Sequence, residues 1–368
     1  MAIIQEDLGA AEPAEPRPFA PVEDAIAAIA RGEIVLVVDD PGRENEGDFV
    51  MAAELVTPET VNFMVTHGRG IVCMPILPDR AATLGLGLMP RRGDYDGCAF
   101  TTSIDLADPP NTGTSAIDRA RCMARVAQPA ATRAEFRQPG HVFPLIAKPG
   151  GVVERRGHTE AAVDLARLAG LQPAGVICEV LSADGSMARV DDLAAVARTH
   201  GLHLITIADL VAYRLEHEPH VRRLSEARIP TPFGGFTAIA FHSDVDGLDH
   251  VALTKGDIEG PGVTVAVHAE CLTGDVLGSL ACDCGARLEK SMRAIADEGR
   301  GAIVYLRGDE AELGCCAGTG SHDAAAQIIR ALDIGSVALL NDTATRFALE
   351  ARGVPIVSCA AGDREVPS

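Results

Sequence analysis

The hydrophobic positions of this chain switch repeatedly between helical and extended spacing. Residues 22–30 place apolar side chains every three or four positions, which predicts a helix, and Gly32 follows where a helix commonly ends. Residues 34–38 then form a short apolar run rich in β-branched side chains, typical of a buried strand. The same patterns predict further strands at residues 49–53, 71–76 and 176–181, and helices from Pro58, over 159–168 and over 192–198, the last capped by Asp191. The first half is therefore expected to be an α/β (α+β) domain.

The second half repeats this alternation after a proline-rich segment. Extended patterns are found at residues 236–241, 250–255, 263–267, 303–306 and 337–340, and helical patterns at 286–298, 324–332 and 345–352. Residues 218–232 hold three prolines and mixed charges, which predicts a linker. The expected organisation is a flexible N-terminus (1–21), a three-layer α/β domain (22–217), the linker, and a C-terminal domain with a mixed α+β sheet (233–368).

Composition narrows the class of partner. The 368 residues include 32 Lys and Arg against 52 Asp and Glu, a net charge of −20, which disfavours nucleic acid and anionic membrane surfaces. The basic side chains are nearly all arginine, which grips phosphate or carboxylate in two-point contacts. No apolar run approaches the ~20 residues of a bilayer span. The first 21 residues lack the pattern of a secretion signal, so we expect a cytoplasmic protein whose 10 cysteines are thiols or metal ligands, with a small phosphorylated partner.

Two polar segments in the first half carry candidate chemistry. Residues 43–48 (RENEGD) follow a buried strand and bring together three carboxylates and Arg43, a set that suits Mg²⁺ or Mn²⁺ beside an anionic ligand. Residues 155–160 (RRGHTE) open a helix, where arginines and backbone N–H groups favour a phosphate. Taken singly, each segment is also compatible with a solvated turn or an ordinary helix start. His141 and Glu179 are titratable groups inside apolar strands, where such a group is either an acid or base tuned by burial or, more commonly, a residue on the solvated face of a half-buried strand.

These segments, with residues 67–73, 112–119 and 137–144, resemble 3,4-dihydroxy-2-butanone-4-phosphate synthase of riboflavin biosynthesis, over residues 22–214. The resemblance implies a lyase, expected to be a homodimer, that converts D-ribulose 5-phosphate to 3,4-dihydroxy-2-butanone 4-phosphate and formate with Mg²⁺ or Mn²⁺. It also implies a role for each of eight side chains. Metal ligation falls to Glu44 and His158, catalysis to His141 and Glu179, and substrate contact to Arg43, Glu44, Asp48, Arg155, Thr159 and Glu179. A metal-dependent sugar-phosphate binder without chemistry is the alternative.

The second half contains a set of cysteines with metal-site spacing. Cys271, Cys282 and Cys284 can bind Zn²⁺ and leave a fourth position open, although buried free cysteines fit the spacing as well. Residues 267–275 and 282–285 resemble the zinc motif of GTP cyclohydrolase II. That family has arginine where this chain has Ala266 and Ala281, and its catalytic Asp and Arg are missing from residues 309–322. We therefore predict no cyclohydrolase activity; the alternatives are a second active site with unfamiliar residues, or a zinc-supported module that binds an effector or partner.

Overall fold

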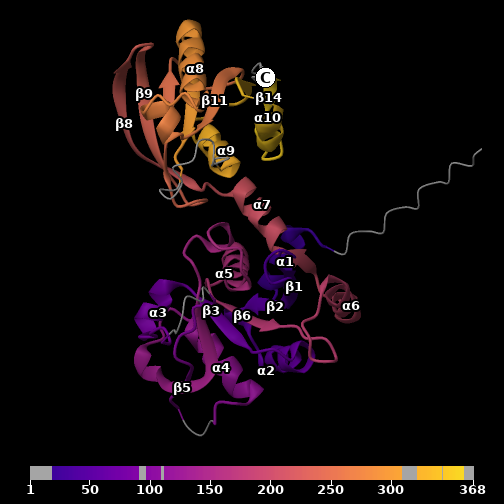
Figure 1. Ribbon diagram of the computed structural model, residues 1–368. Helices are drawn as coiled ribbons and strands as arrows, with labels where there is room; N and C mark the ends of the chain where they lie inside the picture. The colour runs from indigo at the N-terminus through magenta and orange to yellow at the C-terminus, as the bar shows by residue number, and fades with distance from the viewer. Residues whose placement is uncertain (1–18, 91–96, 109–111, 309–320, 342, 360–368) are drawn as a thin grey trace, which may run out of the picture. The chain divides into compact units, whose positions relative to one another are not determined.

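The computed structural model describes residues 19–90, 97–108, 112–308, 321–341 and 343–359 (Figure 1). It confirms two α/β domains, each built on a seven-stranded mixed sheet. The compact units are Met1–Ile146 with Ala161–Ile207, and Ala147–Glu160 with Ala208–Ser368. Most of the expected flexible N-terminus (residues 1–18) and most of the loop compared with the cyclohydrolase family (residues 309–320) lie outside the described residues.

The N-terminal domain alternates strands and helices as its sequence pattern predicts. Its strands are β1 (Val35–Val38), β2 (Gly47–Ala52), β3 (Cys73–Ile76), β4 (Ile104–Leu106), β5 (Phe136–Ile146), β6 (Gly175–Glu179) and β7 (Leu204–Thr206). Its helices are α1 (Val22–Ala30), α2 (Pro58–Phe63), α3 (Pro78–Leu84), α4 (Ala116–Ala127), α5 (His158–Leu168) and α6 (Val190–His200), and the next helix, α7 (Ile207–His217), belongs from Ala208 on to the second compact unit.

The strand order of the first sheet, β4-β5-β3-β6-β2-β1-β7, places β6 and β2 side by side near its centre. These two strands are antiparallel, and their register sets Asp48 opposite Glu179. Strands β1, β2 and β3 are buried at every position, which explains their predominantly apolar sequences. Asp48 on β2 is the acidic exception, and its strand carries it into the interior.

Local signals set several helix ends. Thr57 accepts a hydrogen bond from the backbone N–H of Thr60 and Pro58 occupies the first turn of α2, as expected. Gly32, just past α1, has a φ of 79°, a conformation that glycine adopts without strain. The expected cap at Asp191 is wrong, because α6 begins at Val190 and Arg189 is its N-cap residue.

The C-terminal domain joins an antiparallel half-sheet to a parallel one. Its strands are β8 (Val221–Thr231), β9 (Gly234–Ser243), β10 (Asp249–Lys255), β11 (Val263–Ala269), β12 (Gly301–Leu306), β13 (Val337–Leu339) and β14 (Ile356–Cys359). Its helices are α8 (Cys284–Glu298), α9 (His322–Ala331) and α10 (Thr343–Glu350). The strand order is β14-β13-β11-β12-β10-β9-β8, with β8, β9, β10 and β12 antiparallel in turn and β11 to β14 joined in parallel.

Most of residues 218–232, expected to be a linker, instead form strand β8, which pairs with β9 over Val221–Thr231. The strand lies at the sheet edge and is exposed along most of its length, so its charges stay solvated. Pro230 is tolerated because an edge strand has one side without ladder hydrogen bonds. Of the helices that the structure describes, none has the length and apolar content to cross a bilayer.

Candidate functional site

The loop between β1 and β2 (residues 39–46, the acidic loop) is organised by one buried carboxylate, that of Asp39. Its Oδ2 accepts from the Arg43 guanidinium at 2.7 Å and from the backbone N–H of Glu44 at 3.2 Å, and its Oδ1 accepts from the N–H of Glu46 at 2.8 Å. Arg43 also pairs with the Glu44 carboxylate at 2.6 Å. Asp39 is only 4% exposed, so the loop is fixed from within while Glu44 remains exposed.

The structure brings three potential metal ligands together at this loop. One ligand atom each from Asp39, Glu44 and His158 lies within 4.8 Å of the others. His158 is the first residue of α5 and is buried. The Nε2 atom of its ring is buried without a hydrogen bond among the described residues. Two carboxylates and an imidazole are a donor set that fits Mg²⁺ or Mn²⁺.

Asp48 and Glu179 form a second carboxylate pair, as the β2–β6 register requires. Burial, together with the nearby Glu179, raises the pKa of Asp48 well above its usual range. Glu179 is held by a hydrogen bond from the backbone N–H of Ile71 to its Oε2 at 2.8 Å. A protonated Asp48 beside an oriented Glu179 can relay a proton.

Arg155 and Thr159 lie where α5 begins. The Arg155 guanidinium donates to the buried carboxylate of Glu160 at 2.7 Å, and the other oxygen of Glu160 accepts from the backbone N–H of Lys148. Burial nevertheless raises the pKa of Glu160. Thr159 is only 3% exposed. Glu160, which the sequence analysis did not single out, therefore fixes the direction of Arg155.

His141, on β5, forms a dyad with Asp105 on β4. Its Nδ1 lies 2.9 Å from Asp105 Oδ2, and its backbone N–H donates to Oδ1 at 2.9 Å. The Asp105 side chain is 5% exposed, whereas that of His141 is 46% exposed. Among the described residues, no hydrogen bond of His141 reaches the acidic loop. Asp105 was missed by the sequence analysis because β4 is too short to give a clear pattern.

The three candidate zinc ligands of the C-terminal domain also converge. Sγ atoms of Cys271, Cys282 and Cys284 all lie within 4.8 Å of one another, those of Cys271 and Cys282 being 3.8 Å apart. The Thr273 hydroxyl and the backbone N–H of Gly274 lower the pKa of the Cys271 thiol to about 6. A thiolate is the form that binds zinc, so three converging cysteine sulfurs, with the pKa of Cys271 lowered, fit Zn²⁺.

The segment that carries the three cysteines (residues 271–284, the cysteine loop) is anchored through Asp275. Its carboxylate accepts from the backbone N–H of Cys271 at 3.0 Å and from the Tyr305 hydroxyl at 2.9 Å, and it contacts His268 Nε2 at 3.0 Å. Ala266, where the cyclohydrolase family has arginine, is buried in a core cluster that includes Ile295. The three cysteines are thus present, whereas Ala266 packs in the core at the position where the cyclohydrolase family has an arginine.

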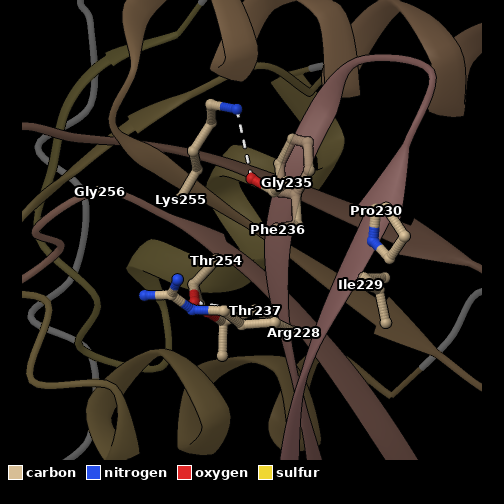
Figure 2. A pocket seen from close by; sticks show the side chains of 9 residues that line it. All are labelled: Arg228, Ile229, Pro230, Gly235, Phe236, Thr237, Thr254, Lys255 and Gly256. Atoms are coloured by element: carbon tan, nitrogen blue, oxygen red, sulfur yellow. Dashed lines mark hydrogen bonds between the residues drawn. The ribbon is translucent and has the colours of Figure 1, made fainter.

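A separate hollow of about 470 Å³ lies at the ends of β8, β9 and β10 (Figure 2). Arg228, Thr237 and Thr254 share one row of the sheet there, and Lys255 donates to the Gly235 carbonyl at 3.3 Å. Lys255 pairs with Gly301 at the start of β12, whereas the cysteine loop follows the end of β11. The hollow is therefore at the opposite end of the strands from the thiols, and its described lining residues include no imidazole, thiol or carboxylate.

Comparisons with known proteins agree with both halves. The family model of 3,4-dihydroxy-2-butanone 4-phosphate synthase matches residues 23–213, and that of GTP cyclohydrolase II matches residues 222–319. A riboflavin biosynthesis protein RibBA from Rhodococcus erythropolis is 46% identical, over 92% of this chain and 88% of its own. RibBX from A. baumannii, a two-domain 3,4-dihydroxy-2-butanone 4-phosphate synthase, superposes with a TM-score of 0.76 and 36% identity over 93% of this chain and 100% of its own.

A further solved structure, a 3,4-dihydroxy-2-butanone 4-phosphate synthase in complex with two magnesium ions, matches with a TM-score of 0.52 and 44% identity. It covers 54% of this chain and 98% of its own. Fold and matches together define a two-domain α/β enzyme of riboflavin biosynthesis. The chain belongs to the 3,4-dihydroxy-2-butanone 4-phosphate synthase family, and it has that synthase activity.

Proposed function

We propose that the N-terminal domain converts D-ribulose 5-phosphate to 3,4-dihydroxy-2-butanone 4-phosphate and formate with Mg²⁺ or Mn²⁺ held by Glu44 and His158. The observation that carries this assignment is the convergence of Asp39, Glu44 and His158 within 4.8 Å. A related synthase was solved in complex with two magnesium ions, which supports a divalent ion here. Such an ion, when bound, polarises the ketone and neighbouring hydroxyl of the sugar and so eases proton removal.

The side chains of this site divide into anion-binding and proton-transfer groups. Arg43, Arg155 and Thr159 would contact the substrate, the two arginines being pre-oriented by Asp39 and Glu160. Asp48 and Glu179 would contact the sugar, with Glu179 also moving protons. His141 would act as acid or base: with Nδ1–H directed at Asp105, the neutral ring leaves Nε2 as an acceptor.

Turnover of ribulose 5-phosphate with Mg²⁺, followed by formate release, tests the assignment. Glu44→Gln and His158→Ala should each lower kcat/KM by at least 10²-fold and weaken Mn²⁺ binding to the full chain, because each removes a donor atom. Glu23→Gln, an exposed change on α1, is the matched control. Normal Mn²⁺ affinity in both variants would refute the metal assignment.

For the C-terminal domain we propose a zinc-bearing unit without GTP cyclohydrolase II activity. The Cys271, Cys282 and Cys284 group supports zinc, while Ala266 and Ala281 leave two expected phosphate partners absent. Each lost charge-assisted contact costs roughly 1.5–3 kcal/mol, so several losses remove useful affinity for GTP. The similar RibBX from A. baumannii is described as a two-domain synthase, which supports one activity on two domains.

The test is incubation of the zinc-loaded full chain with GTP, beside an active GTP cyclohydrolase II. We expect neither formate nor pyrophosphate above background. Release of both at a rate near that of the control enzyme would instead establish a bifunctional protein. Binding of GTP or a flavin without turnover would favour an effector module.

Three coarser expectations accompany these assignments. We propose that the N-terminal domain ends near residue 217 and that the C-terminal domain begins near 221 rather than 233, because β8 belongs to the C-terminal sheet. We also propose a homodimer, as the family resemblance implies. The cytoplasmic location stays a prediction. Light scattering on the purified chain gives the oligomeric state directly.

A further inference from the structure

Arg189, which lies outside the acidic loop, donates hydrogen bonds to the backbone of that loop. The Nη1 atom of Arg189 donates to the carbonyl oxygen of Glu44 at 3.0 Å and also to that of Asn45. Arg189 is 145 residues from Glu44 in sequence and immediately precedes α6. It is exposed and forms no ion pair among the described residues, so its contacts there are to main-chain oxygens alone.

The shape of the loop suits this contact. Asn45 has a φ of 55°, in the left-handed region that asparagine tolerates better than most residues. One nitrogen can therefore serve two successive carbonyls. One turn into α6, Leu193 packs against Gly47, where an added Cβ would lie 2.4 Å from a Leu193 methyl. Loop and helix start are thus joined at two points, on either side of Glu46.

The base of Arg189 is itself anchored. Its backbone N–H donates to Asp192 Oδ2 at 3.3 Å, and the same oxygen accepts from the Ser182 hydroxyl at 3.2 Å. The guanidinium therefore projects from a capped helix end. Asp39 holds the loop from inside and Arg189 holds it from outside, which leaves the carboxylate of Glu44 no backbone freedom to turn away.

We propose that Arg189 is a positioning residue of the synthase, one that fixes the main chain of residues 44–45 so that Glu44 is presented to the divalent ion and Arg43 to the substrate. The inference rests on the metal-binding role proposed for Glu44. In this proposal Arg189 itself contacts neither the divalent ion nor the substrate. Groups that orient metal ligands typically affect metal affinity or activity by 10–100-fold, and that is the effect expected here.

A purely electrostatic role and a positioning role of Arg189 predict opposite changes in divalent-cation affinity when the side chain is removed, so the two roles can be told apart. Removing a cation beside five carboxylate-bearing positions of residues 39–48 would by charge alone tighten binding of a divalent cation. Loss of positioning would weaken it. The experiment measures Mn²⁺ affinity by electron paramagnetic resonance, and kcat and KM for ribulose 5-phosphate, on full chains carrying Arg189→Ala, Arg189→Lys or the control Arg198→Ala on the exposed side of α6.

For Arg189→Ala we expect 10–100-fold weaker Mn²⁺ binding and a raised KM, with an unchanged thermal midpoint. Arg189→Lys should retain part of the affinity, and added guanidinium should restore part of the activity of the alanine variant. Affinity equal to that of Arg198→Ala, or tighter, would overturn the proposal, as would a loss accompanied by unfolding and not rescued by guanidinium. If Glu44→Gln leaves Mn²⁺ affinity normal, the proposed function fails first and separately.

Discussion

At the scale of single residues, Asp48 is a buried carboxyl group whose ionised form is strongly disfavoured. It is 3% exposed, and Glu179, Glu46, Glu44 and Asp39 all disfavour its ionised form. The folded chain therefore binds a proton at Asp48 that the unfolded chain releases above a pKa of about 4. Stability tied to this group is full below that pH and is lost as the pH rises toward the elevated pKa of the folded state.

Asp48→Asn should remove this pH dependence, because the amide keeps the shape of the neutral acid. In metal-free protein the variant should match the parent in thermal midpoint near pH 4 and exceed it increasingly toward pH 7, by at most about 1.4 kcal/mol per pH unit. Formate release should fall sharply. Thermal scans from pH 4 to 8, with exposed Asp191→Asn as control, provide the measurement. A difference that is constant across pH would contradict the burial argument.

In this protein the sequence predicts candidate site residues more readily than it predicts which residues hydrogen-bond to them. The sequence predicts Glu44, His158, Asp48 and Glu179 as site residues, because they lie in polar segments or interrupt apolar strands within motifs that resemble the synthase family. It could not find the partners Asp105 or Arg189, because their contacts join residues 36 and 145 positions apart. Such pairings depend on strand register and helix placement, which no local pattern contains.

At the scale of elements, α5 matters because it begins with His158 and Thr159. It packs on β6 at a point where two small residues face each other. A Cβ added at Gly175 would lie 2.5 Å from the Ala162 methyl and 3.1 Å from its backbone carbonyl carbon. No rotamer change relieves a contact with backbone, so the helix itself would have to move.

Gly175→Ala should therefore destabilise the N-terminal domain by about 1–3 kcal/mol and weaken Mn²⁺ binding, because α5 carries a metal ligand. Ala162→Gly in the same chain should recover part of both losses despite its own helical cost of about 1 kcal/mol. Gly87→Ala, at a position with no neighbour within 4 Å, serves as control. Additive effects of the two substitutions in a double-mutant cycle would disprove direct packing.

Element prediction was accurate where a period was long or a run was buried, as in α5, α8 and β1. It failed where exposure hid the pattern. Strand β8 was mistaken for a linker because an edge strand with both faces solvated contains charges and a proline. Strand β4 spans only Ile104–Leu106, too few positions for alternation to be recognised.

At the scale of the whole molecule, the two sheets have separate interiors. The C-terminal domain has core clusters of its own, built from β9 to β14 with α8, α9 and α10. Its cysteine loop adds little apolar burial, since Val276 is 67%, Leu277 71% and Leu280 101% exposed. The proposed zinc ion would order this loop by linking Cys271 to the start of α8 at Cys284.

Cys282→Ser should therefore abolish stoichiometric zinc in the full chain and lower the thermal transition of the C-terminal domain, while formate release from ribulose 5-phosphate stays within about twofold of the parent. The separation is expected because the proposed synthase groups reside on the loop between β1 and β2, on β2, β5 and β6, and around the start of α5, with none contributed by the cysteine loop. Cys359→Ser, a half-buried thiol of the same domain outside the cluster, is the matched control. Zinc analysis, two-transition calorimetry and a formate assay on one preparation settle the outcome. Retained zinc with an unchanged transition would contradict the three-thiolate site, and a parallel loss of synthase activity would show that the second domain acts on the first.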